Sequence, residues 1–154
     1  ASPRPVRFVM DHRIFRTPLL GFIFRHTGAI PIAPAKEDPE MMEKAFAEVS
    51  TALRNVDLVG IFPEGAITHD GELQTFRPGI SRILQRDPVP VVPMALSGLW
   101  GSFFSRIDGG AMKTPFRRGA FSRIALTVGE PVPAAQATPA HLQALVLALR
   151  GERR

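Results

Sequence analysis

Residues 57–65 read Asp-Leu-Val-Gly-Ile-Phe-Pro-Glu-Gly. The apolar run that ends at Phe62 predicts a strand over residues 57–62, buried within a sheet. Pro63 and Gly65 then favour a stiff, tight turn that presents Glu64 at its tip. Because ligands gather at the carboxyl ends of strands in α/β sheets, this turn is the first candidate for a functional site.

Helices and strands alternate on both sides of this stretch. Asp38-Pro39 is typical of a helix start, and apolar residues at helical spacing follow it until Asn55. Thr138-Pro139 predicts a second capped helix, closed by Gly151. The other expected elements are strands at 6–10, 29–33, 89–96 and 121–128 and helices at 18–26 and from Pro78. The alternation predicts an α/β sheet with helices packed on it, in a single domain over residues 1–154.

Composition excludes several kinds of protein. A chain of 154 residues with 45% hydrophobic and 21% charged residues is typical of one folded domain. Without cysteine it has no disulfide, thiolate metal site or cysteine nucleophile. Its four histidines have no metal-ligand spacing, so no metal is expected. The longest apolar runs, such as 19–24, have six residues and are too short to span a membrane.

The net charge of +5 is distributed unevenly. Residues 1–35 carry +4, residues 36–100 carry −4, and residues 101–123 carry +4. Both basic stretches also contain several Phe residues. Basic and aromatic residues together suit an anionic membrane surface, although the same mixture could contact nucleic acid. Alternatively, the Phe residues belong to the core and the Arg residues to a solvated rim.

Polar groups near the turn would suit a phosphate. The free backbone N–H groups of the turn, with Arg77 nearby, could face an anion, and the Glu64 carboxylate could accept a hydrogen bond from a hydroxyl. Considered alone, however, a Pro-Glu-Gly sequence is more often only a turn.

Several motifs occur in an order that resembles the glycerol-3-phosphate and lysophosphatidate acyltransferase family. The third block of that family is similar to Phe62-Pro63-Glu64-Gly65 with a downstream Phe76-x-x-Gly79. Its second block resembles Phe15-x-x-Pro18-Leu19-Leu20-Gly21 followed by residues 28–32, and its fourth block resembles residues 89–95. The resemblance covers about residues 6 to 133, and the run at 28–36 looks most like the acyltransferase modules fused to bacterial lysophospholipid transporters.

This resemblance implies a mixed, largely parallel sheet flanked by helices and a definite reaction. An acyl group would move from a thioester, acyl-CoA or acyl-carrier protein, to the glycerol hydroxyl of a lysophospholipid, without a metal or prosthetic group. The residues implied in substrate binding are Phe62, Pro63, Glu64, Gly65, Thr68, Lys36 and Arg77. For Lys36 and Arg77, a solvated surface charge is an equal alternative.

The sequence departs from the family pattern in two ways. The family uses a His followed five positions later by an Asp, as general base and orienting group, and none of the four His residues here has that partner. We therefore expect an N-terminally truncated domain, whose catalytic pair precedes Ala1 and which is inactive alone. In addition, Ala66-Ile67-Thr68 and Ala33-Pro34 stand where the family often has phosphate-binding arginines. An acceptor with a head group, such as lysophosphatidylethanolamine, is therefore favoured over a simple phosphomonoester.

Three interpretations follow for partners and location. The first is the acyltransferase, at the cytoplasmic face of a membrane, peripheral or tethered through another domain such as a transporter. The second is a non-catalytic relative that binds membrane phospholipid through its basic, Phe-rich stretches. The third, a nucleic-acid-binding domain, is supported only by the pI near 10.9, and the acidic residues 36–100 argue against it.

Overall fold

The structure is a computed structural model that describes residues 4–16, 18–66, 68, 70–98 and 124–151. The chain divides into two compact units. Unit 1 comprises residues 1–62 and 82–87, and unit 2 comprises residues 63–81 and 88–154.

Unit 1 contains a three-stranded parallel sheet in the order β2-β1-β3. The strands are β1 (Val6–Asp11), β2 (Ile30–Ile32) and β3 (Leu58–Gly60). Parallel neighbours need crossover connections, and helices supply both of them. The connecting helices are the 3-10 helix η1 (His12–Arg16), α1 (Pro18–His26) and α2 (Pro39–Arg54). This parallel sheet with its helices confirms the predicted α/β fold class.

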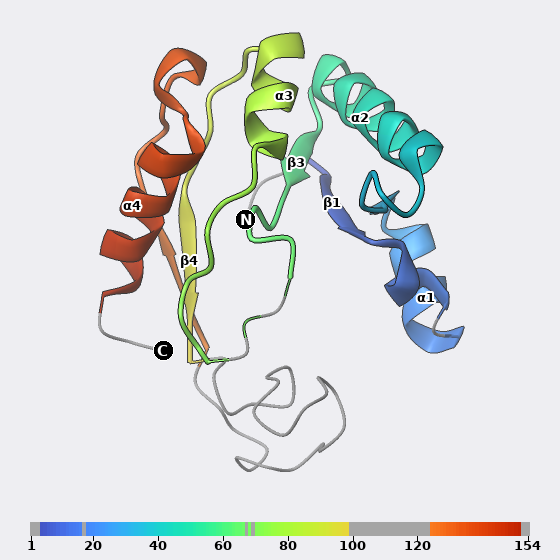
Figure 1. Ribbon diagram of the computed structural model, residues 1–154, viewed down its shortest axis with the longest axis horizontal. Helices are drawn as coiled ribbons and strands as arrows, with labels where there is room; N and C mark the ends of the chain where they lie inside the picture. Colours follow the sequence, from blue (N-terminus) through green and yellow to red (C-terminus); the bar gives the residue numbers. More distant parts are fainter. Residues whose placement is uncertain (1–3, 17, 67, 69, 99–123, 152–154) are drawn as a thin grey trace. The chain divides into compact units, whose positions relative to one another are not determined.

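Helix α2 begins and ends where the sequence predicts. The Asp38 side chain accepts a hydrogen bond from the N–H of Met41 at 2.9 Å, and Pro39 occupies the first turn. Its inner face is buried with β2, in a core formed by Ile30, Ala45 and Val49. Figure 1 shows α2 lying along this sheet.

Arg82 of helix α3 (Gly79–Arg86) contacts α2. The guanidinium of Arg82 lies over the Phe46 ring, 4.4 Å from its centroid, and donates to the Glu43 carboxylate. Cation–π and ionic contacts thus join residues that are far apart in sequence.

Unit 2 pairs β4 (Met94–Ser97) with β5 (Ala125–Val128) in antiparallel register. Ala95 and Ser97 are buried and alternate with exposed side chains, as expected of strands with one covered face. Helix α4 (Pro139–Arg150) packs against β4 and follows the short 3-10 helix η2 (Ala134–Gln136). Thr138 accepts from the N–H of His141 at 3.2 Å, and Gly151 has a positive φ of 58°, so both predicted ends of α4 are confirmed.

Two of the predicted strands are much shorter than expected. The strand predicted over 57–62 is only Leu58–Gly60, and its residues are half-buried rather than buried. The strand predicted over 89–96 is paired only from Met94, apart from a single bridge between Val91 and Val132. The prolines of that stretch lack the N–H that a ladder needs, which accounts for its late start. Residues 121–123 of the last predicted strand lie outside the described part.

Among the described residues, no helix combines the length and apolar character needed to cross a membrane.

Candidate functional site

The residues that follow β3 form a closed loop in unit 2, here called the 63–77 loop. The N–H of Arg77 donates to the carbonyl oxygen of Pro63 at 2.8 Å and joins the two ends. Loops of this size with adjacent ends are held by their own side chains and often carry function. The structure describes this loop except at positions 67 and 69.

Gly65 has a backbone conformation that only glycine adopts easily. Its φ is +65°, in the left-handed region, and the guanidinium of Arg77 lies directly against it. A Cβ atom built on Gly65 would stand 2.8 Å from Arg77 Nε. The fold therefore places an exposed cationic side chain beside a turn, which is a suitable arrangement for an anion.

The Glu64 side chain binds within the loop. Its Oε2 accepts a hydrogen bond from the backbone N–H of Gln74 at 2.7 Å, and the residue is half-buried. The expectation that Glu64 is simply presented at the tip of a turn is therefore incomplete. A carboxylate has about four acceptor positions, so it can hold Gln74 and still accept a substrate hydroxyl.

Thr68 and Asp70 organise the far end of the loop. The Thr68 hydroxyl donates to Asp70 Oδ1 at 2.7 Å and accepts from the N–H of Gly71 at 3.1 Å. Asp70 Oδ1 also accepts from the N–H of Glu72 at 2.9 Å. Such side-chain to backbone bonds are typical of turns. Thr68, predicted as a substrate contact, has its polar partners inside the loop.

The predicted site residues are divided between the two units. Pro63, Glu64, Gly65, Thr68 and Arg77 come together in the 63–77 loop of unit 2. The other two predicted residues, Lys36 and Phe62, belong to unit 1.

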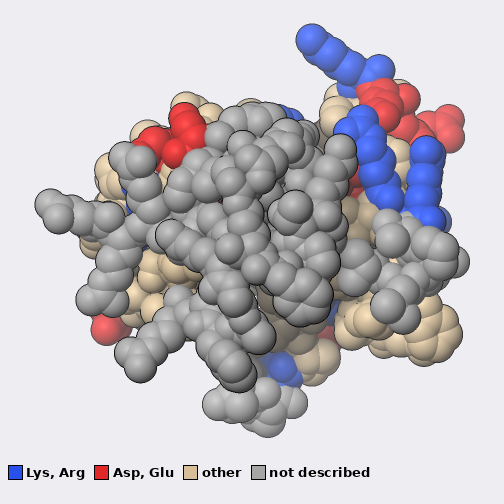
Figure 2. All heavy atoms as spheres, turned by 90° about the horizontal axis from the view of Figure 1, so that it is seen from below, with Lys and Arg blue, Asp and Glu red and all other residues tan. Residues whose placement is uncertain are grey.

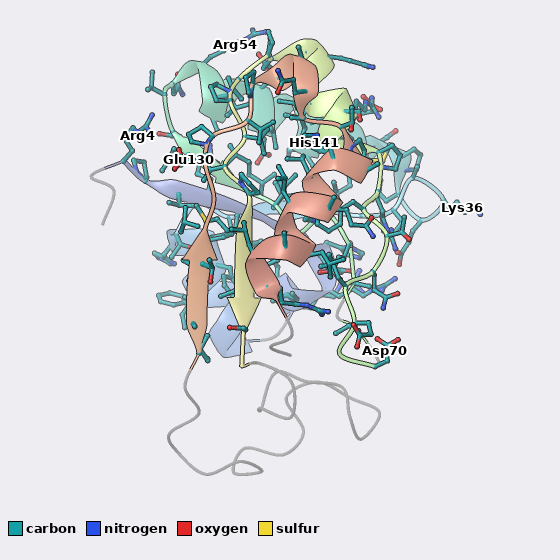
Figure 3. The ribbon with its side chains drawn as sticks, turned by 90° about the vertical axis from the view of Figure 1, so that its left-hand side faces the viewer. Arg4, Lys36, Arg54, Asp70, Glu130 and His141 are labelled. Atoms are coloured by element: carbon teal, nitrogen blue, oxygen red, sulfur yellow. The ribbon has the colours of Figure 1, made fainter. Side chains whose placement is uncertain are left out.

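The two site residues of unit 1 have different surroundings. Lys36 lies exposed in the turn before α2 and is labelled in Figure 3. Phe62 is 54% exposed and stacks on Phe8, with ring centroids 6.1 Å apart. The Phe8 ring in turn covers Gly60, where a Cβ atom would meet it at 2.6 Å.

The described part of the basic stretch 1–35 contains paired charges. Arg13 donates through Nη2 to both oxygens of Glu37, at 2.8 and 2.7 Å, and this hydrogen bond holds the pKa of the Glu37 carboxyl below its ordinary value. Asp11 lies 3.7 Å from the same guanidinium. In Figure 2, Lys and Arg side chains likewise lie beside Asp and Glu side chains at one edge of the face shown. Arg13 is therefore not an uncompensated charge.

Sequence reasoning missed three residues that shape the loop. Gln74 holds Glu64, while Gln143 and Arg150 of α4 bind the loop backbone. Gln143 and Arg150 lie seven residues apart on α4, and the helix sequence carries no signal for their partners in the loop. Within the described ranges, no group of three acidic or His residues is placed to hold a metal ion.

Comparison with known proteins gives a consistent result. The family model described as Acyltransferase matches residues 1–97. The chain is 29% identical over 92 residues to the chloroplastic 1-acyl-sn-glycerol-3-phosphate acyltransferase BAT2 of Brassica napus, over 60% of this chain and 26% of the relative. It is 28% identical over 92 residues to LPAT1, the enzyme of the same description from Arabidopsis thaliana, over 60% of this chain and 25% of the relative. The chain thus spans about a quarter of the length of these curated relatives.

A solved structure shares the fold. The crystal structure of the 1-acyl-sn-glycerophosphate acyltransferase PlsC from Thermotoga maritima superimposes with a TM-score of 0.63 at 20% sequence identity. The match covers 94% of this chain and 53% of the solved one.

Proposed function

Because this chain belongs to the acyltransferase family, we propose that it is a glycerophospholipid acyltransferase domain that acylates a lysophospholipid. The observation that supports this best is the 63–77 loop. It lies within the matched region and places the Glu64 carboxylate and the Arg77 guanidinium on one closed turn. A carboxylate beside a cation suits an acceptor that carries a hydroxyl next to a phosphate.

The proposed reaction is acyl transfer from a thioester. The glycerol oxygen attacks the thioester carbonyl carbon, a C–O bond forms, the C–S bond breaks, and the thiol leaves with the proton that the hydroxyl gives up. In this chain, Arg77 would bind the phosphate of the acceptor and Glu64 would orient its hydroxyl by accepting a hydrogen bond. Acyl-CoA or acyl-carrier protein would supply the acyl group, and no other cofactor is proposed.

The base that takes the proton is not assigned to this chain. No His of the sequence is followed five positions later by an Asp, so no residue pair fits that role. We infer that a pair upstream of Ala1 supplies it.

The acceptor proposed is a lysophospholipid with an added head group. Ala66, Ile67 and Thr68 follow the turn, where the resembling family often places an arginine. With Arg77 as the cation of the loop, a phosphodiester with its single negative charge is better matched than a doubly charged phosphomonoester. Lysophosphatidylethanolamine is a representative of this class.

The proposed partner is the surface of a membrane, approached from the cytoplasmic face. The acyl chain of the acceptor is held in a bilayer, so the domain must act at its surface or receive the lipid from a linked transporter domain. Phe22 and Ile23 of α1 are 61% and 44% exposed, which gives the basic stretch 1–35 apolar side chains to place at a lipid interface.

The experiment that tests this function measures acyl transfer from acyl-CoA and from acyl-carrier protein to lysophosphatidylethanolamine and lysophosphatidate. It compares the chain of 154 residues with a version extended upstream to its own His-x-x-x-x-Asp pair. We expect turnover by the extended version and a rate about two to four orders of magnitude lower for the chain alone, the usual loss when a general base is missing.

An arginine pair provides the control for the site. Arg77→Met in the extended version should raise the KM for the acceptor, whereas Arg86→Met makes the same change at the exposed end of α3 and should not. Robust transfer by the chain alone would disprove the assignment of the base. Binding of lysophospholipid without turnover in the extended version would instead support a non-catalytic phospholipid-binding relative.

A further inference from the structure

Helix α4 binds the 63–77 loop at two points within unit 2. Gln143 Oε1 accepts a hydrogen bond from the N–H of Phe76 at 3.0 Å. About two helical turns later, Arg150 donates through Nη1 to the carbonyl oxygen of Gly71 at 3.0 Å and through Nη2 to Glu72 Oε2 at 2.9 Å. Figure 3 shows the loop that carries Asp70 beside the C-terminal end of this helix.

The burial of Arg150 distinguishes it from an ordinary basic residue at a helix end. Its side chain is only 13% exposed, against 42% for Glu72, and its Nε is buried with no hydrogen-bond partner in the described part of the chain. An arginine that merely complemented the helix dipole would keep its charge in water. Because a buried guanidinium is unfavourable unless it is paired, Arg150 and the loop hold each other in place.

The loop residues that Arg150 binds are connected to Glu64 through Gln74. The side-chain amide of Gln74 donates to the carbonyl oxygen of Glu72 at 3.2 Å. Its backbone N–H donates to Glu64 Oε2 at 2.7 Å. A displacement of the backbone at Glu72 would therefore also displace the group that orients the Glu64 carboxylate.

We propose that Arg150 and Gln143 are positioning residues, through which α4 holds the 63–77 loop in the conformation that binds the acceptor. The role of the loop in binding an acceptor rests on the function proposed above. The contact between α4 and the loop does not depend on that function, so the two can be tested separately.

The first test uses amide hydrogen exchange in the chain of 154 residues and needs no activity. Arg150→Met and Gln143→Met should each speed exchange of the peptide 70–76 by about tenfold, the effect expected when a charge-assisted or buried hydrogen bond is lost. Gln143→Glu keeps an acceptor oxygen and should restore slow exchange at Phe76. Arg86→Met, an arginine change at an exposed helix end, serves as the matched control. Unchanged exchange across α2 would show that the variants remain folded.

The second test separates positioning from folding by steady-state kinetics in the upstream-extended version. Arg150→Met should raise the KM for the lysophospholipid about tenfold, which corresponds to one lost charge-assisted bond, and leave the KM for the acyl thioester within about twofold. Arg150→Lys, which keeps the charge opposite Glu72, should recover part of this loss. If no version transfers acyl groups, the proposed function fails while the exchange result still decides whether α4 holds the loop. Unchanged exchange of peptide 70–76 in Arg150→Met, or an unchanged acceptor KM in an active enzyme, would overturn the proposal.

Discussion

Glu64 lies half-buried in the turn after β3, and its Oε2 accepts a hydrogen bond from the backbone N–H of Gln74 at 2.7 Å. The side chain thus has two roles. It holds the loop through Gln74 and, by our proposal, it orients the acceptor hydroxyl. The two roles can be separated because glutamine keeps an acceptor oxygen but loses the charge.

For Glu64 we predict different outcomes for two substitutions in the upstream-extended version. Glu64→Ala removes the bond to Gln74 and should lower kcat/KM by an amount equivalent to about 1.5–3 kcal/mol of activation free energy, the value of a hydrogen bond to a charged group. Glu64→Gln should keep the thermal stability of the chain and an intermediate kcat/KM. Steady-state kinetics and thermal unfolding would measure both effects. Wild-type turnover by Glu64→Ala would show that the turn is only structural.

Gly65 provides a second residue-scale prediction. Gly65→Ala forces a Cβ atom into a position at φ +65° that lies 2.8 Å from Arg77 Nε. We expect a loss of about 1–2 kcal/mol in the free energy of unfolding, the usual cost of left-handed backbone for an L-residue. Gly79→Ala is the control, since a Cβ atom there meets nothing within 4 Å. Chemical denaturation would measure both variants, and equal stability of the two would contradict this account of Gly65.

At the scale of elements, the two long helices depend on side-chain caps. Asp38 caps α2 through Met41, and Thr138 caps α4 through His141. Asp38→Ala and Thr138→Ala should each lower the free energy of unfolding by about 0.5–2 kcal/mol, because one orphan N–H loses its partner. Asp38→Asn, which can still accept the bond, should stay close to wild type. Denaturant titration is the measurement, and no difference between the Ala and Asn variants would show that the cap contributes nothing.

Helix α4 also links the element scale to the site. It begins at the Thr138 cap, and the loop contacts of Gln143 and Arg150 lie further along it. Weakening the cap should therefore loosen the 63–77 loop as well as the helix. The Asp38 cap, by contrast, belongs to α2 in unit 1.

At the scale of the whole molecule, we predict salt-dependent binding to anionic vesicles through the basic stretches 1–35 and 101–123. Each Lys or Arg near an anionic surface contributes about 1 kcal/mol, screened over about 8–10 Å at ordinary ionic strength. Residues 101–123 lie outside the described part, so this expectation rests on the sequence. Co-sedimentation with neutral and anionic vesicles across a salt series is the measurement.

The matched variants for this experiment differ only in where the charge is reversed. Arg117→Glu/Arg118→Glu should weaken binding to anionic vesicles. Lys44→Glu/Arg86→Glu makes the same change in net charge within residues 36–100 and should not. The prediction would be contradicted by equal binding to neutral and anionic vesicles that changes neither with salt nor in either double variant. The basic stretches would then be ordinary solvated surface.

The sequence by itself determined the elements whose signals are local. Helices α2 and α4 begin at the predicted Asp38-Pro39 and Thr138-Pro139 pairs and end at Asn55 and Gly151. Caps, proline at the first turn and helical spacing act over a few residues, so they can be read directly along the chain. The turn at 63–65 and its Gly65 were predicted for the same reason.

Only the tertiary structure decided which groups meet across long stretches of sequence. The three-residue length of β3 and the antiparallel pairing of β4 with β5 depend on which strand neighbours are available. Gln143 and Arg150 reach the loop over 67 and 79 residues. No local pattern specifies such partners, because packing alone brings these backbone and side-chain groups within hydrogen-bond distance. For that reason the residues of the turn could be predicted, whereas the residues that hold it in place could not.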